Sequence, residues 1–479
     1  MCLLGCFFPC DKDGDCVITI YLDSQSKKPY YEQIYAYMRE EIRAGRIGCH
    51  EKMPSSRKLA ENLGVSRSTV DTAYAQLLAE GYIESRPKSG YYVCNIDELL
   101  NMVPVAYPPS IPAVVEKEEV RWDFSPTGAD SLNFPDAYWR KLSRECINYD
   151  DGTIFRSSEP QGDWGLRREL SNYLRQNRGV LAQPDNIIIG AGSQYLMMLL
   201  LRLIGKHSVI AMENPAYMPS YTTFQSLERK VVAISTDEHG LSVEELKESE
   251  ANIAYVTPSH QYPLGMVMPV SRRTKLLNWA NYEPNRYIIE DDYDSEFRYQ
   301  GKPIPALQGM DKGKKVIYLG SFSKVVSPAI RMSYMVLPDS LLAKYQRLFQ
   351  TFPSTVSRLD QAIMTRFLSE GYFERHLNRL RNRYKTRHDI MLRELKKRKE
   401  LVRLSGTNAG SYIVLEWLGL MGEEELLEEA KKLKVKLYPL RQYEIAPSFH
   451  MYPTFLMGFA QLSETEIEEA FQALFDVWK

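Results

Sequence analysis

The sequence predicts a multidomain chain in which a small N-terminal helical unit precedes a larger α/β domain. With 479 residues, the chain is too long for one ordinary domain. Two patterns indicate the two parts. Residues 30–81 show helical spacing of apolar side chains, and from Trp122 onward buried β-like runs alternate with helical segments. Hydrophobic residues make up 44% of the chain and charged residues 25%, which is typical of a globular protein.

Three helices and a hairpin are expected in the N-terminal unit. Apolar residues recur on one face over 30–47, and a serine at 55 or 56 caps a second helix that ends at Gly64. Ser66 caps a third helix that runs to Gly81. Two short helices joined by a tight glycine-containing turn have the geometry of a helix-turn-helix. Two strands around a turn at 88–90 would add a wing.

The start of the third helix has the composition of a nucleic-acid contact. Ser66, Arg67 and Thr69 present hydroxyls, backbone N–H groups and a guanidinium to a phosphate or a base edge. Because the net charge is −1, any surface for a polyanion must be local. A single arginine at a helix start is usually only solvated, but four basic residues fall on one expected face. We therefore predict contacts to double-stranded DNA from Arg57, Ser66, Arg67, Thr69, Arg86 and Lys88.

The segment Met53–Val93 resembles the winged helix-turn-helix of the GntR family of transcription regulators. The matching elements are Pro54-Ser55-x-Arg57-x-Leu59-Ala60, Leu63-Gly64-Val65-Ser66-Arg67-x-Thr69-Val70, Ala73-Tyr74, Leu77, Glu80-Gly81-Tyr82-Ile83 and Gly90. The resemblance implies that Arg57, Arg67 and the wing carry the DNA contacts. We assign this domain to residues 17–94.

A linker and an α/β domain are predicted to follow. Residues 95–121 are rich in proline and then in charge, which indicates an extended linker. Residues 122–479 form the second domain, with a large lobe at about 150–350 and a smaller α+β lobe at about 351–479. The buried runs predict a mainly parallel sheet covered on both faces. These runs are Ile187–Ile189, Val209–Ala211, Val231–Ile234, Ile253–Val256, Tyr287–Ile289, Val316–Leu319 and Met332–Val336, and the small lobe adds Ser411–Leu415 and Thr454–Gly458.

Lys324 is the candidate catalytic residue. It follows a predicted strand, serines precede it, and Arg331 lies seven positions later. This arrangement suits a Schiff base beside an anchored phosphate, in which Ser321, Ser323 and Arg331 hold the phosphate oxygens. A Ser-x-Ser-Lys run alone would be weak evidence for such a site.

Acidic residues end another predicted strand 33 residues upstream. A pyridoxal phosphate ring needs a carboxylate against its pyridinium nitrogen, and open α/β sheets gather ligands at the carboxyl ends of their strands. We assign this role to Asp291 and a hydrogen bond to the ring hydroxyl to Tyr293, whereas Asp292 is expected to be structural.

Further candidates follow other strands. Gly192, Ser193 and Gln194 open a helix whose amides could cradle the phosphate. Tyr217 could stack on the pyridine ring or belong to the core. A turn-rich loop at the same edge offers His260 and Gln261 as effector contacts, although a lone histidine is more often structural.

These motifs, in this order, resemble fold-type I aminotransferases from about Trp122 to the C-terminus. Together with the N-terminal unit, the whole chain resembles the MocR/GabR-type regulators. The resemblance implies pyridoxal 5'-phosphate as the cofactor, an amine or amino-acid effector that reacts at the aldimine, and a homodimer, expected head to tail, whose two heads address paired DNA half-sites.

Regulation and catalysis are the two competing interpretations of the second domain. An active aminotransferase with an added DNA-binding unit would need an arginine clamp for a substrate carboxylate. The closing strand around Thr454–Gly458 holds no arginine, and Arg441 is the nearest candidate. We therefore favour a sensor without significant turnover. A third interpretation is a domain that only dimerises and binds no cofactor.

Residues 1–16 fall outside the resemblance, and four of the seven cysteines lie there. No histidine is nearby, so we expect no metal site. The apolar run of this segment ends at Asp11 and lacks the cationic start of a signal peptide. No apolar stretch is long enough to span a bilayer. We expect a cytoplasmic protein, and one interpretation of this segment is an upstream artefact of start-site choice.

Overall fold

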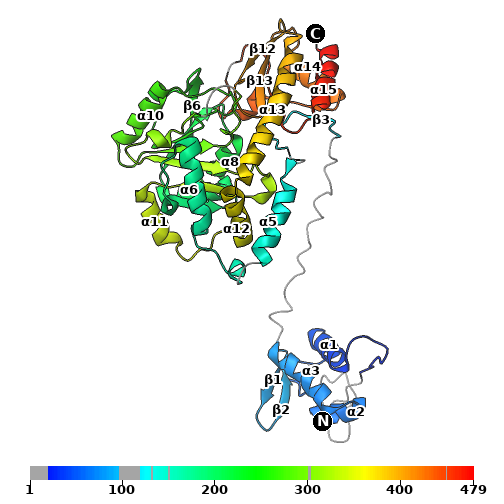
Figure 1. The fold of residues 1–479 in the computed structure, drawn as a ribbon. Coiled ribbons are helices and arrows are strands. Elements are labelled where there is room, and N and C mark those ends of the chain that lie inside the picture. Colours follow the sequence, from blue (N-terminus) through cyan, green and yellow to red (C-terminus); the bar gives the residue numbers. More distant parts are fainter. Residues whose placement is uncertain are drawn as a thin grey trace. The chain divides into compact units, whose positions relative to one another are not determined.

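The computed structural model describes residues 20–95, 119–130, 133–148, 152–299, 304–448 and 450–478. The chain divides into two compact units, one that ends at Lys117 and one that begins at Glu118 (Figure 1). Most of the predicted linker and all of residues 1–16 lie outside the described residues. Within the described part, no helix is both long enough and apolar enough to cross a membrane.

Three helices and a hairpin form the first unit. They are α1 (Tyr30–Arg43), α2 (Ser56–Leu63), α3 (Arg67–Ala79), β1 (Ile83–Arg86) and β2 (Gly90–Val93). Side-chain caps begin α2 and α3, because the Ser55 hydroxyl accepts from the Lys58 N–H and the Ser66 hydroxyl from the Thr69 N–H. Gly64 ends α2 with a left-handed φ of +65°. The expected helix-turn-helix and wing are therefore present.

An eight-stranded sheet forms the centre of the second unit. Its strands, in spatial order, are β4 (Ile187–Gly190), β11 (Ser333–Val336), β10 (Val316–Ser321), β9 (Tyr287–Asp292), β8 (Ile253–Val256), β5 (Val209–Asn214), β6 (Lys230–Asp237) and β7 (Gly240–Leu241). The pairs from β10 through β6 are parallel, whereas β11 runs antiparallel to both of its neighbours. The predicted mainly parallel sheet is confirmed, with one antiparallel strand in its interior.

Helices cover both faces of this sheet, because alternate residues of each buried strand point to opposite sides. Ile187 and Ile189 join the core cluster that contains α5 (Asp136–Asn148), α6 (Trp164–Arg178), α12 (Arg358–Ser369) and α13 (Tyr372–Lys396), whereas Ile188 faces α7 (Ser193–Ile204). The other helices of the large lobe are α8 (Met218–Ser226), α9 (Val243–Glu248), α10 (Val270–Tyr282) and α11 (Asp339–Phe349).

The small lobe contains a four-stranded antiparallel sheet. Its order is β12 (Val402–Ser405), β13 (Tyr412–Trp417), β16 (Thr454–Gly458) and β15 (Tyr438–Pro439), and α14 (Glu423–Lys432) and α15 (Glu464–Val477) complete the lobe. The start of the unit also belongs here, because β3 (Trp122–Asp123) pairs in parallel with β14 (Val435–Lys436).

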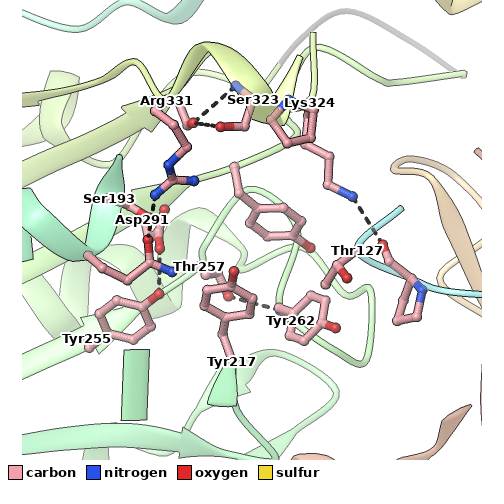
Figure 2. A pocket seen from close by; sticks show the side chains of 15 residues that line it. Thr127, Ser193, Tyr217, Tyr255, Thr257, Tyr262, Asp291, Ser323, Lys324 and Arg331 are labelled. Carbon is pink, nitrogen blue, oxygen red and sulfur yellow. Dashed lines mark hydrogen bonds between the residues drawn. The ribbon is translucent and has the colours of Figure 1, made fainter. Parts of the chain in front are cut away.

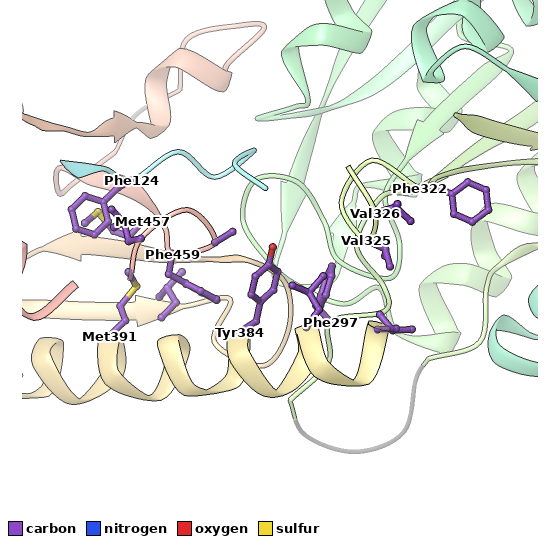
Figure 3. Packing of buried hydrophobic residues seen from close by; sticks show 14 of the residues in the cluster. Phe124, Phe297, Phe322, Val325, Val326, Tyr384, Met391, Met457 and Phe459 are labelled. Atoms are coloured by element: carbon purple, nitrogen blue, oxygen red, sulfur yellow. The ribbon is translucent and has the colours of Figure 1, made fainter. Parts of the chain in front are cut away.

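One apolar core joins the two lobes. Figure 3 shows Val325 and Val326, next to the candidate lysine, in a cluster that continues past Tyr384 and Met391 of α13 to Phe459 of the small lobe. The long helix α13 therefore lies along both lobes, and the backbone around Lys324 is held by the same core that supports the small lobe.

Candidate functional site

A cavity of about 200 Å³ lies at the carboxyl ends of the parallel strands. Parallel sheets bring the ends of several strands together at one edge, so residues far apart in sequence meet there. Ten of the residues that line the cavity are labelled in Figure 2. Predicted residues in the lining are Ser193, Gln194, Tyr217, Asp291, Tyr293, Ser321, Ser323, Lys324 and Arg331.

Lys324 carries the amine of this cavity. It follows β10, and its Nζ donates to the carbonyl oxygens of Gly128 at 3.0 Å and Pro126 at 3.2 Å. Burial lowers the pKa of this amine to about 8, and the negative charge of Asp294 opposes that shift. A lysine with a lowered pKa has a larger fraction of the neutral, nucleophilic form near pH 7. The site is therefore suited to covalent chemistry on a carbonyl compound.

Asp291 is the second-to-last residue of β9, and its buried carboxylate has one defined side-chain partner. The Tyr255 hydroxyl donates to Asp291 Oδ2 at 2.5 Å and accepts from Ser220 Oγ at 3.0 Å. Burial raises the pKa of Asp291 to about 6, although the hydrogen bond from Tyr255 acts in the opposite direction. A cation placed against this carboxylate would therefore be strongly favoured.

Asp292 belongs to a different environment from that of its neighbour. Its Oδ2 accepts from Arg178 Nη2 at 2.8 Å and Nε at 2.9 Å, and also from the Tyr318 hydroxyl. Both charged side chains are buried, and the ion pair with its hydrogen bonds compensates for the desolvation of the two charges. Asp292 does not line the cavity.

Anion-binding groups gather at the start of α7. Gly192 has a φ of +97°, and a Cβ at this position would lie only 2.2 Å from Arg331 Nη2. The guanidinium therefore lies against the glycine backbone, and Arg331 Nη2 also donates to Gln194 Oε1 at 3.4 Å. The positive end of a helix dipole and a guanidinium favour a phosphate at this place.

Two serine hydroxyls extend this anion site. Ser321 Oγ lies 2.9 Å from Ser323 Oγ and accepts from the Ser323 N–H at 3.1 Å, while Ser333 Oγ donates to Ser321 at 3.0 Å. The hydroxyls are thereby oriented beside Lys324, at the end of β10.

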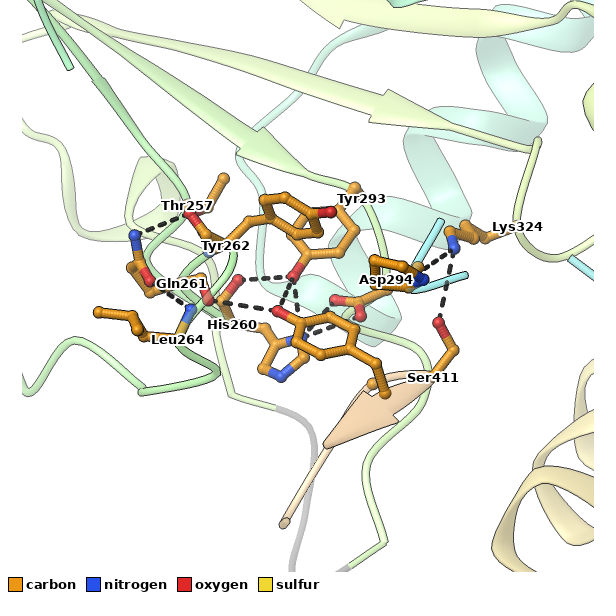
Figure 4. Close-up of polar contacts among 12 residues, drawn as sticks. Thr257, His260, Gln261, Tyr262, Leu264, Tyr293, Asp294, Lys324 and Ser411 are labelled. Carbon is orange, nitrogen blue, oxygen red and sulfur yellow. Dashed lines mark hydrogen bonds and ion pairs between the residues drawn. The ribbon is translucent and has the colours of Figure 1, made fainter. Parts of the chain in front are cut away.

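The remaining wall of the cavity is aromatic. Tyr217 follows β5, and its ring meets Tyr262 edge to face at 5.3 Å. Burial and the nearby charge of Asp291 raise the pKa of Tyr217 to about 12. The Tyr293 hydroxyl lies 3.0 Å from both the carbonyl oxygen and Nδ1 of His260 and 3.2 Å from the Tyr412 hydroxyl (Figure 4).

The structure does not bring the three predicted effector residues into the lining. His260 is buried behind Tyr293, with Nδ1 at 2.9 Å from Asp294 Oδ2. Gln261 is buried, and its amide bonds the backbone of Pro215, Tyr262 and Leu264. Arg441 is half-exposed and pairs with Glu423 at 2.7 Å.

Several lining residues were not singled out from the sequence, among them Thr127, Tyr255 and Tyr262. A tyrosine inside a buried strand needs a partner for its hydroxyl, and this signal could have identified Tyr255. Thr127 has no comparable local signal, because it reaches the cavity only through the folding of the chain.

The predicted DNA-contact residues lie on the first unit and are accessible. The side chains of Arg57 and Arg67 are 79% and 69% exposed, and each pairs with an acid four residues later on its own helix. Arg86 pairs with Glu84 and lies 4.3 Å from the ring centre of Tyr92, and Lys88 is exposed. Exposed i,i+4 ion pairs contribute at most about 1 kcal/mol, so these guanidinium groups can exchange a carboxylate for a phosphate.

Comparisons with known proteins cover both units. Residues 30–93 match the bacterial regulatory proteins of the gntR family, and residues 126–474 match the class I and II aminotransferases. The chain is 38% identical over 468 residues to the HTH-type transcriptional regulator YdeL of Bacillus subtilis (strain 168), across 96% of this chain and 99% of the relative. It is 32% identical over 473 residues to the probable rhizopine catabolism regulatory protein MocR of Rhizobium meliloti, across 95% of both.

Among solved structures, the kynurenine aminotransferase of Pyrococcus horikoshii superposes with a TM-score of 0.67 at 25% identity, over 80% of this chain and 100% of that one. The N-terminal helix-turn-helix, the aminotransferase-like second unit and the two full-length relatives indicate the same family. The chain belongs to the MocR/GabR-type GntR family of HTH-type transcriptional regulators, which carry an aminotransferase-like domain.

Proposed function

We propose that this regulator binds pyridoxal 5'-phosphate at Lys324 and senses a small amine or amino acid there. The observation that carries the proposal is the convergence of Lys324, Asp291 and Arg331 on one cavity. The donor set fits the cofactor, because a buried amine, a buried carboxylate and a cationic phosphate site are the three groups that the aldehyde, the ring nitrogen and the phosphate require. Gly192 supports the fit, since any Cβ would fill the space beside Arg331.

Each residue then has a defined task. Lys324 would supply the nucleophilic amine, and Asp291, which the hydrogen bond from Tyr255 positions, would hold a proton on the ring nitrogen. Arg331, Gly192, Ser193, Gln194, Ser321 and Ser323 would hold the phosphate, Tyr217 would stack on the ring, and Tyr293 would contact the ring hydroxyl. When bound, the cofactor supplies an aldehyde that combines reversibly with amines. An effector amine that takes the place of Lys324 would shift the conformational equilibrium of the protein only by its differential affinity for two arrangements of the domain.

We favour a sensor over an aminotransferase. Among the described residues that line the cavity, the cations are Lys324 and Arg331, and the proposal assigns both to the cofactor. Arg441, the candidate carboxylate clamp, pairs with Glu423 and lies outside the lining. This arrangement favours capture of an amine without repeated turnover.

Absorption spectroscopy tests the proposal. The purified protein should be yellow, and Lys324→Ala should lose the visible band while retaining the fold. Amines are then titrated into the wild type, and keto-acid formation is assayed in the same samples. A spectral shift without product supports the sensor, whereas multiple turnovers support the aminotransferase. A colourless protein that pyridoxal phosphate does not convert would overturn cofactor binding.

The first unit is proposed to contact operator DNA through Arg57, Ser66, Arg67, Thr69, Arg86 and Lys88. Support comes from their exposure and from the position of Ser66, Arg67 and Thr69 at the start of α3. We further propose a head-to-tail homodimer that acts in the cytoplasm, as the family resemblance implies, with two heads on paired half-sites. Light scattering and footprinting on an operator test these points, and binding should weaken as salt rises.

A further inference from the structure

The Lys324 amine makes its direct polar contacts at the interface between the two lobes. Lys324 itself belongs to the large lobe, but its Nζ lies 3.0 Å from the Gly128 carbonyl oxygen, 3.2 Å from that of Pro126 and 3.5 Å from Ser411 Oγ (Figure 4 shows Lys324 and Ser411). Ser411 directly precedes β13 of the small lobe and is buried. Three oxygens therefore face the three N–H donors that a lysine ammonium carries.

The two carbonyl oxygens belong to a segment that the small lobe holds in place. This segment, residues 122–128, follows the linker directly. Its strand β3 pairs with β14, and the Phe124 carbonyl accepts from the Gly458 N–H at 2.9 Å. A Cβ on Gly458 would lie 2.0 Å from the Ser125 oxygen, and one on Gly128 would lie 2.7 Å from the Gln461 side chain. Glycines at both positions allow this close packing.

A buried charge favours the ammonium form at the same place. Asp294 accepts from His260 Nδ1 at 2.9 Å, and both side chains are almost fully buried. Gly410 permits this arrangement, since a Cβ there would lie 2.2 Å from His260 Cε1 and 2.9 Å from Asp294 Oδ2. The negative charge of Asp294 raises the pKa of the Lys324 amine against the effect of burial.

The number of N–H donors on Lys324 depends on whether its nitrogen is joined to the cofactor. A free ammonium has three N–H groups, whereas a lysine nitrogen bonded to the cofactor aldehyde keeps at most one. Only the free ammonium can therefore satisfy all three oxygens at once. We propose that Ser411 and the carbonyl oxygens of Pro126 and Gly128 form a holding site for the Lys324 ammonium whenever the lysine is not joined to the cofactor.

This holding site would connect the chemistry of the cavity to the rest of the chain. An amine that displaces the lysine would free the ammonium, which then links the large lobe to β13 and to the segment that leads to the linker. The inference rests on the proposed binding of the cofactor at Lys324. Ser411 acts in it as a positioning residue, because it contacts the lysine and is not among the residues that line the cavity.

Two forms of the full-length protein test the proposal. Pyridoxal phosphate joins Lys324, whereas pyridoxamine phosphate carries an amine in place of the aldehyde and leaves the lysine free. Hydrogen exchange, read by mass spectrometry, compares peptides that cover 119–130 and 407–417. We expect exchange about tenfold slower or more with pyridoxamine phosphate, because charged hydrogen bonds oppose local opening. Equal exchange in the two forms would overturn the holding site.

Three variants and the spectrum separate the possible explanations. Lys324→Met should remove the difference between the two forms, and Ser411→Ala should reduce it. Ser171→Ala serves as the matched control, because Ser171 is a buried serine that bonds the Ala182 carbonyl at 2.8 Å in the large lobe, and it should keep the full difference. A difference that persists in Lys324→Met refutes the proposal. Absence of a visible band with pyridoxal phosphate would instead refute cofactor binding at Lys324.

Discussion

Replacement of Gly192 by alanine should separate cofactor affinity from folding. The residue has φ +97° and ψ 161°, a conformation that alanine adopts only at a cost of about 1–3 kcal/mol. The added Cβ would lie 2.2 Å from Arg331 Nη2, the mobile end of a long side chain. The guanidinium must therefore move away, while the backbone can stay in place.

The loss of affinity follows from the contacts that Arg331 would make. Hydrogen bonds to charged groups contribute about 1.5–3 kcal/mol each, so displacement of the guanidinium from a phosphate should raise the Kd for pyridoxal phosphate about 10- to 100-fold. Titration of the cofactor-free protein, followed by absorbance, measures this change. Thermal melting in the same buffer measures the cost of the backbone.

Gly205 provides a matched control at the other end of the same helix. It has φ +101° and ψ 163°, and no atom lies within 4 Å of the Cβ that a substitution would add. Gly205→Ala should thus lower the Tm to a similar extent and leave the Kd unchanged. If both variants bind the cofactor equally well, the close approach of Arg331 to Gly192 has no part in binding.

Three further predictions concern single side chains. Burial raises the pKa of Asp291 from 3.8 to about 6, so the cofactor-free protein should lose stability as the pH rises through this range. Asp291→Asn should therefore increase the free energy of unfolding by about 3 kcal/mol at neutral pH. An equal gain at about pH 4 would contradict this prediction. Arg67→Ala should weaken operator binding and reduce its salt dependence without changing the Tm. Arg168→Ala, a control on the second unit, should leave operator binding unchanged. Unchanged operator affinity in Arg67→Ala would refute the contact. Ser66→Ala should cost about 1 kcal/mol of stability in the first unit through loss of the α3 cap, and an unaltered Tm would contradict the capping role.

Local patterns predicted most of the fold. Runs of buried β-branched residues identified the strands, as at Ile187–Ile189, because a strand covered on both faces buries apolar side chains on both sides. Serine and glycine marked the ends of α2, since the cap and the left-handed residue act within one helical turn. The antiparallel direction of β11 was not predicted, because strand direction depends on the path of the chain between strands.

The candidate site was predictable where its residues lie near the carboxyl end of a strand, as Asp291 does within β9 and Lys324 does shortly after β10. Contacts from segments distant in sequence were not predicted, such as those of the Gly128 carbonyl and Ser411 with the lysine amine. Arg441 illustrates the opposite case. Its position near the closing strand suggested a clamp, but nothing in the local sequence indicates that its guanidinium turns toward Glu423.

The pairing of β3 with β14 has a consequence during synthesis. Trp122 pairs with Val435, and Phe124 packs 5.5 Å from Phe471, so these contacts of the second unit can form only after nearly the whole chain has been synthesised. The DNA-binding unit draws its core from residues 20–93 alone and can fold much earlier. A polypeptide interrupted before Val435 would therefore contain the complete core of the first unit but lack the strand that pairs with Trp122 in the second.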